Sequence, residues 1–170
     1  MDSTLDFTIC YNRYKKKLFN FVLRMTGDRM TSEDIVQTVF LRFFRNMGNI
    51  RNSSSVVFWL YKSARNEIYT HFRTKKRFSE KHVSDDVSEL NLKSGGNAET
   101  EFIKNELREA LMTQINLLPD DQKEVFLLKE YSDLSYEEIA SICEIETSLV
   151  KSRLYSARQR LIKKIQPDLN

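Results

Sequence analysis

Hydrophobic residues recur three and four positions apart through most of the first half of the chain. This spacing is typical of one helix face and predicts helices over residues 6–25, 31–46 and 58–77. Thr31 and Asp34 have the spacing of a capping box, which would start the second helix at residue 31. Residues 47–55 are polar and aperiodic, so we expect an exposed loop there. Three such helices can close a small core over residues 1–78.

The helical pattern stops between residues 79 and 97 and then returns. Ser, Asp and Asn dominate this stretch, which also holds the Gly95-Gly96 pair, so we expect a flexible acidic linker. After it, periodicity predicts helices over 98–117, 120–132, 135–143 and 147–165. Pro119 ends the first of these, and Ser135 with Glu138 forms a capping box for the third. The pattern predicts a second, four-helix domain over residues 98–170, with a very short turn between its last two helices.

The composition supports an all-α fold and excludes several classes of protein. Only 4 Gly and 2 Pro occur in 170 residues, too few for a turn-rich sandwich or barrel. The 2 Cys and 2 His give neither a disulfide framework nor metal-ligand spacing, and we expect no metal. The sequence shows no signal peptide and no apolar run long enough to span a membrane. We therefore expect a cytoplasmic protein in a reducing compartment.

Charge is segregated along the chain although the net charge is only +3. Residues 58–77 contain six basic residues and one acidic residue (+5), whereas residues 120–146 contain two basic and nine acidic residues (-7). Residues 147–165 contain six basic residues and no acidic one (+6). Solvated helix faces usually mix both signs, so a cationic helix in each half favours two contacts with a polyanion over a plain charged surface.

The last two predicted helices have the form of a helix-turn-helix. The small Ala140 would let the helices cross closely, and Ile139, Cys143, Val150 and Leu154 would supply their shared core. The second helix would then present an outward face to the major groove of DNA. A plain helical hairpin fits the same apolar pattern. The +6 charge favours the DNA-binding interpretation.

Aromatic residues are interleaved with the cations of residues 59–77. Aromatic rings stack on unpaired bases while cations hold the phosphate backbone, so this segment suits a single-stranded or melted nucleic acid. For any one of Trp59, Tyr61, Tyr69 and Phe72, a place in the core is the simpler interpretation, since several lie at helical spacing. Lys62 and Asn66 are harder to explain as core residues.

A third surface lies on the predicted helix over residues 31–46. Its outer side carries an exposed apolar residue among polar ones, a pattern that suits a partner helix and equally suits a solvated face. The residues of this surface are Asp34, Gln37, Leu41, Arg42 and Arg45.

Three ordered segments resemble one family. They are SEDIVQTVFLRFF (32–44), FWLYKSARN (58–66), and the stretch from LP (118–119) through LSYEEIA (134–140) to VKSRL (150–154). These segments look like those of the extracytoplasmic-function (ECF) group of the sigma-70 family, bacterial RNA polymerase initiation factors. The resemblance covers both halves of the chain in order, which is far more specific than a lone helix-turn-helix.

The resemblance implies roles for the surfaces described above. Residues 1–78 would be region 2, whose outer helix face (Asp34, Gln37, Leu41, Arg42, Arg45) grips the coiled coil of the largest polymerase subunit. The loop over 47–55 would hold a flipped non-template base. The -10 promoter element would be contacted by Lys62, Arg65, Asn66, Tyr69, Arg73, Lys75 and Lys76.

Residues 98–170 would be region 4, which contacts the -35 element and the flap of the second-largest polymerase subunit. The residues involved would be Lys129, Ser148, Lys151, Ser152, Arg153, Tyr155 and Arg158. The linker over 79–97 would stand in place of a larger region 3. The family further implies an anti-sigma factor as a partner, of a kind that can be membrane-linked, and no cofactor or small-molecule substrate.

Several positions depart from the family pattern. Thr70 stands where Asp is usual, Ser156 where Arg is frequent, and Thr38 where Glu is common. Glu144 replaces the usual turn glycine, and a non-glycine residue with positive φ is strained. Glu146 occupies the expected N-cap of the last helix, where Ser is usual. We interpret these departures as changes of specificity.

Other functions fit less well. An enzyme is not expected, because no nucleophile with a base partner, phosphate loop or metal cluster is present in the sequence. A sigma-like decoy that binds an anti-sigma factor without directing transcription should have lost its DNA-facing cations. An ordinary helix-turn-helix regulator would leave the motifs of the first half unexplained.

Overall fold

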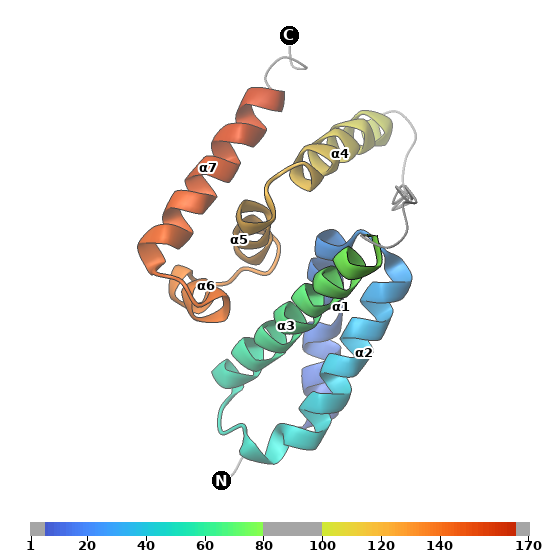
Figure 1. The fold of residues 1–170 in the computed structure, drawn as a ribbon, viewed down its shortest axis with the longest axis vertical. Helices are drawn as coiled ribbons and strands as arrows, with labels where there is room; N and C mark the ends of the chain where they lie inside the picture. The colour runs from blue at the N-terminus through green and yellow to red at the C-terminus, as the bar shows by residue number, and fades with distance from the viewer. Residues whose placement is uncertain (1–5, 80–99, 166–170) are drawn as a thin grey trace.

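The protein is all-α in the residues that its structure, a computed structural model, describes: 6–79 and 100–165. Figure 1 shows the long helices of residues 6–79 bundled side by side, with the helices of residues 100–165 to one side of them. We call residues 6–79 the first half and residues 100–165 the second half. The helices are α1 (Phe7–Thr26), α2 (Arg29–Asn46), η1 (Met47–Asn49), α3 (Ser53–Ser79), α4 (Thr100–Asn116), α5 (Asp120–Glu130), α6 (Tyr136–Cys143) and α7 (Thr147–Ile165).

The first half forms the predicted three-helix bundle. Helices α1, α2 and α3 pack against one another in all three pairs. Gly27 ends α1 in the left-handed conformation (φ 72°), which costs glycine little, and its N–H donates to the carbonyl of Leu23. Phe21, Val39, Phe43 and Leu60 are completely or almost completely buried between the three helices.

The cap of α2 differs from the predicted one. Asp28, not Thr31, is the N-cap, and its carboxylate accepts a hydrogen bond from the Thr31 backbone N–H at 2.8 Å. This bond favours the charged carboxylate, so hydrogen bonding to Thr31 lowers the pKa of Asp28. The capping box predicted from Thr31 and Asp34 is therefore wrong, because the chain re-enters a helix directly after the Gly27 turn.

The predicted loop over residues 47–55 is also shorter than expected. Residues Met47–Asn49 form a 3-10 turn, and α3 already begins at Ser53. The side-chain oxygen of Asn52 accepts a hydrogen bond from the Ser55 backbone N–H at 2.8 Å, which satisfies a free donor in the first turn of α3. The polar Ser run therefore belongs to the start of a helix.

The second half forms the four predicted helices. Both hydrogen bonds of the capping box at Ser135 and Glu138 are present. Glu144 follows α6 in the left-handed conformation (φ 58°), as predicted for the position of a turn glycine. Of the predicted linker over 79–97, only Ser79 is described, as the last residue of α3; the rest lies outside the described residues.

The buried residues of both halves form one continuous hydrophobic cluster. Helix α6 packs on α3 and helix α5 packs on α1. The Arg24 guanidinium on α1 lies 4.1 Å from the centre of the Tyr131 ring that follows α5. The described residues contain no helix that is both long and apolar enough to cross a bilayer. The division into independent domains stays a prediction.

Candidate nucleic-acid interface

Helix α7 has a buried side and an exposed side. Val150, Leu154, Ala157 and Leu161 are buried against the rest of the second half. Four of the predicted -35 residues lie together on the opposite, exposed side: Ser148, Lys151, Ser152 and Tyr155. The Tyr155 side chain is 66% exposed, so its ring and hydroxyl are available to a partner. This side of α7 has the polar and cationic character of a helix that enters the major groove.

Tyr136, at the start of α6, places two lysines near one another. Its ring centre lies 4.8 Å from the Lys129 ammonium and 5.5 Å from the Lys151 ammonium. Lys129 also donates to the Leu134 carbonyl at 3.2 Å. Sequence reasoning missed Tyr136, although its position directly after the N-cap Ser135 signalled a residue at the helix-turn-helix surface.

The remaining two predicted -35 residues pair with acids on α5. Arg153 Nε lies 3.3 Å from Asp121 Oδ2, and Arg158 pairs with Glu130. The hydrogen bond that Arg158 donates to the Glu130 carboxylate raises the pKa of the Arg158 guanidinium. Ion pairs this accessible to water contribute little to stability.

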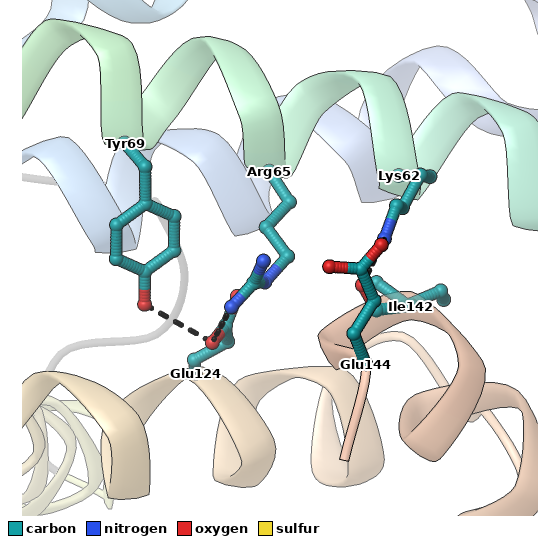
Figure 2. Close-up of polar contacts among 6 residues, drawn as sticks. All are labelled: Lys62, Arg65, Tyr69, Glu124, Ile142 and Glu144. Carbon is teal, nitrogen blue, oxygen red and sulfur yellow. Dashed lines mark hydrogen bonds and ion pairs between the residues drawn. The ribbon is translucent and has the colours of Figure 1, made fainter.

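Three of the predicted -10 residues on α3 face the second half instead of solvent (Figure 2). Arg65 Nε lies 2.6 Å from Glu124 Oε1, and the Tyr69 hydroxyl donates to Glu124 Oε2 at 3.1 Å. Lys62 Nζ lies 2.6 Å from Glu144 Oε1 and 3.3 Å from the Ile142 carbonyl oxygen. These contacts join α3 to α5 and to the end of α6.

The Glu124 cluster is shielded from water. The Glu124 side chain is 1% exposed and that of Arg65 is 21% exposed. Burial alone would lower the pKa of the Arg65 guanidinium, but the charge of Glu124 and its hydrogen bond more than offset this, so the pKa is raised. Burial and the Glu124 charge together raise the pKa of Tyr69, so the phenol stays protonated and donates to the carboxylate.

The other predicted -10 residues are exposed along α3: Asn66, Arg73, Lys75 and Lys76. Arg73 donates to the Thr70 hydroxyl at 3.2 Å. Among the aromatic residues, Tyr61 is only 2% exposed and belongs to the core, where burial raises its pKa to about 12. Trp59 and Phe72 are partly buried against the same core.

All five residues of the predicted α2 surface are exposed: Asp34, Gln37, Leu41, Arg42 and Arg45. Leu41 is 59% exposed, and Arg42 pairs with Glu67 on α3. Phe44 continues the three-and-four spacing of the apolar residues of α2, which predicts a core position, but it is 63% exposed and extends this surface. Its spacing of three from Leu41 was the signal that could have assigned it here.

The described residues contain no group of His, Cys, Asp or Glu that could hold a metal ion. The two cysteines are buried free thiols. Burial raises the pKa of Cys143 to about 12, so this thiol is protonated and unreactive at neutral pH.

Comparison with known proteins gives concordant matches. The family model for sigma-70 region 2 matches residues 10–78, and that for sigma-70 region 4 matches residues 108–161. The ECF RNA polymerase sigma-E factor of Escherichia coli K12 is 31% identical over 169 residues, covering 95% of this chain and 87% of that protein. The RNA polymerase sigma-H factor of Pseudomonas aeruginosa is 28% identical over 167 residues, covering 95% and 86%.

Two solved structures share the fold. The sigma factor RpoE in its complex with the anti-sigma factor NepR from Bartonella quintana aligns with a TM-score of 0.79 at 24% identity, covering 95% of this chain and 97% of that one. CnrH in complex with the cytosolic domain of CnrY aligns with a TM-score of 0.64 at 16% identity, covering 95% and 88%.

These matches, with the two cationic helices, define the class of the protein. The chain belongs to the sigma-70 family, the RNA polymerase sigma factors that direct transcription initiation. Within that family it is a member of the ECF group, as its sequence motifs indicated.

Proposed function

We propose that this sigma factor binds core RNA polymerase through α2 and contacts a promoter with α7 at the -35 element and α3 at the -10 element. The observation that carries the proposal is the placement of one strongly cationic helix in each of the two matched regions. In this role the protein supplies specificity to the polymerase and performs no reaction of its own.

Helix α7 is suited to reading duplex DNA. Ser148, Lys151 and Ser152 lie on the exposed side of its N-terminal part, where a recognition helix meets base edges. Arg160, Lys163 and Lys164 follow on the C-terminal part and are exposed, so they can track the phosphate backbone. Lys129 and Tyr155 extend the same contact, and Arg153 and Arg158 join it when they leave their α5 partners.

Helix α3 is suited to a melted strand. Its cations would hold the backbone of the non-template strand while Tyr69 and Asn66 contact unpaired bases. The short connection between η1 and α3 lies at one end of this helix, where a flipped base could be captured. Extruding a base costs about a few kcal/mol of unstacking, so its capture can drive promoter opening without ATP.

We further propose two protein partners. The exposed α2 surface with Leu41 and Phe44 offers an apolar centre with a polar rim, which fits the coiled coil of the largest polymerase subunit. The flap of the second-largest subunit would contact the second half. An anti-sigma factor, which we propose to be membrane-linked, would hold the protein inactive, since the similar RpoE structure is a complex with an anti-sigma factor.

A decoy without transcriptional activity is the second candidate. Such a protein would need neither the exposed cations of α7 nor those at the end of α3, and both sets are present. We therefore favour the initiation factor.

In vitro transcription tests the proposal. Purified core polymerase with this protein, on a pool of genomic fragments of the host, should give discrete new start sites that share two spaced upstream elements. Core binding without initiation would support the decoy. No binding to core would contradict both functions.

Replacing Lys151 with Ala should weaken binding to -35 duplex by about 1 to 3 kcal/mol if this side chain reads a base edge. The loss should then be confined to one position of the element, whereas a pure phosphate contact would give a smaller loss for every sequence. Fluorescence anisotropy with single-base variants of the duplex measures this. Lys16→Ala, an exposed lysine on α1, is the charge-matched control. Equal binding by Lys151→Ala and the parent would rule out both roles.

A further inference from the structure

We propose that the second half inhibits the first: in the free protein, Glu124 and Glu144 occupy the α3 residues Lys62, Arg65 and Tyr69, so that the -10 strand cannot bind there. This inference rests on the proposed function of α3. It makes the contact in Figure 2 a regulatory latch that must open before the promoter strand is engaged. We call the three α3 residues with Glu124 and Glu144 the latch.

Charge complementarity supports the latch. Residues 120–146, which run from α5 through α6, contain nine acidic and two basic residues, whereas residues 58–77 of α3 contain one acidic and six basic. The two segments therefore attract each other as a polyanion attracts a cationic helix. At the point of contact the carboxylates of Glu124 and Glu144 take the place that phosphate groups of a DNA strand would take.

The burial of Glu124 indicates that α5 is built for this contact. A carboxylate that is 1% exposed requires hydrogen-bond partners, because an unpaired buried charge is strongly destabilising. Within the described ranges 6–79 and 100–165, the Glu124 side chain accepts hydrogen bonds only from Arg65 and Tyr69 of α3. The second half by itself therefore gives this carboxylate no partner there, and its burial is explained by the closed arrangement.

Glu144 gives a second, independent indication. It lies in the left-handed conformation at φ 58°, where glycine would make the same turn without strain. Its side chain reaches Lys62, and the hydrogen bond from Lys62 lowers the pKa of Glu144, so the carboxylate stays charged. A glycine at this position could not make the contact. The Glu144 side chain is 73% exposed, so this pair is weaker than the Glu124 cluster and adds a second contact at the α6 end of the latch.

The latch is selective for one surface. Lys62, Arg65 and Tyr69 are covered, whereas the exposed side of α7 and the α2 surface remain open. The free protein can therefore meet core polymerase through α2 while these three residues of its -10 surface are blocked. A contact that blocked the protein as a whole would have covered α2 or α7 as well.

The test uses the full chain with Glu124→Gln, Glu144→Gln and the double variant. Glu130→Gln is the matched control: it also removes one carboxylate from α5 and frees an arginine, Arg158, but leaves the latch untouched. Small-angle X-ray scattering of the free proteins reports opening without reference to DNA. Anisotropy with a short single-stranded DNA of mixed sequence reports access to α3, and circular dichroism checks that each variant is helical.

We expect the parent and Glu130→Gln to scatter as the compact structure does, and the double variant to have a larger radius of gyration. The double variant should bind the single strand about tenfold more tightly than Glu130→Gln does, since its competent state is more populated. Should Glu124→Gln fail to fold, Glu144→Gln alone should shift both readouts in the same direction.

Three results would overturn the latch. They are an extended parent in solution, a double variant that stays compact, and an open double variant with no gain in affinity. The failure of the proposed function is a different result: no transcription by polymerase core with the parent protein, whatever the scattering shows.

Discussion

Binding of -35 duplex DNA by the free protein is expected to weaken roughly 500-fold when salt is raised from about 50 to about 200 mM. Five cations of α7 are exposed, namely Lys151, Arg158, Arg160, Lys163 and Lys164, and we count Arg158 because it can leave its exposed partner Glu130. Arg153 is not counted, since it is only partly exposed beside Asp121. If each of the five neutralises one phosphate, the plot of log affinity against log salt has a slope of about -4.5. A fourfold rise in salt concentration then lowers the affinity by about 2.7 orders of magnitude.

Anisotropy titrations at four or more salt concentrations measure this slope. The double variant Lys163→Gln/Lys164→Gln should flatten it by about 1.8, because two phosphate contacts are lost. Glu33→Gln, an exposed carboxylate on α2 paired with Arg29, should leave it unchanged. A parent slope near zero would mean that α7 does not lie on the DNA backbone.

Replacing Phe43 with Ala should lower the free energy of unfolding by about 3 to 5 kcal/mol, a large part of the roughly 5 to 15 kcal/mol that holds an ordinary domain together. The ring is completely buried, and its centre lies 5.8 Å from that of Trp59 and 6.1 Å from that of Phe7. Removing the ring leaves a cavity, and the three packed helices of the bundle can relax only partly to fill it.

Phe44→Ala is the matched control, because it deletes the same side chain one residue further along α2, where it is 63% exposed. Its effect on stability should stay below about 1 kcal/mol. Urea unfolding followed by circular dichroism compares the two variants with the parent. Similar losses in both would contradict the assigned faces of α2. Phe44→Ala should instead weaken binding to core polymerase, as expected for a residue of the α2 surface.

Helical periodicity was sufficient to predict the seven α-helices, because each helix buries one apolar face and exposes its opposite, polar face to water. The helix ends were less predictable, since caps depend on single side-chain oxygens. Asp28 and Asn52 accept hydrogen bonds from the first turns of α2 and α3, but nearby Ser and Thr residues are equally good candidates for the N-cap in the sequence. The α7 face followed directly from the spacing of Ser148, Lys151 and Tyr155.

The covered part of α3 could not be predicted from the sequence. Lys62 and Arg65 look like solvent-facing residues of a cationic helix, and Glu124 looks like an ordinary charge on the surface of α5. Their contact joins positions 59 residues apart in the chain for Arg65 and Glu124, and no local pattern signals it. Only the packing of one half on the other shows that the carboxylate is buried.

Because the latch joins residues of one chain, the fraction of molecules in which it is open does not depend on the amount of protein present. Producing more copies raises the number of closed and open molecules together, but the open fraction stays the same because closure needs no second molecule. Dilution likewise does not release it. That fraction changes only when a ligand binds the open form more tightly than the closed one, so availability of polymerase and promoter, rather than abundance of the sigma factor, would set the fraction of molecules that is active.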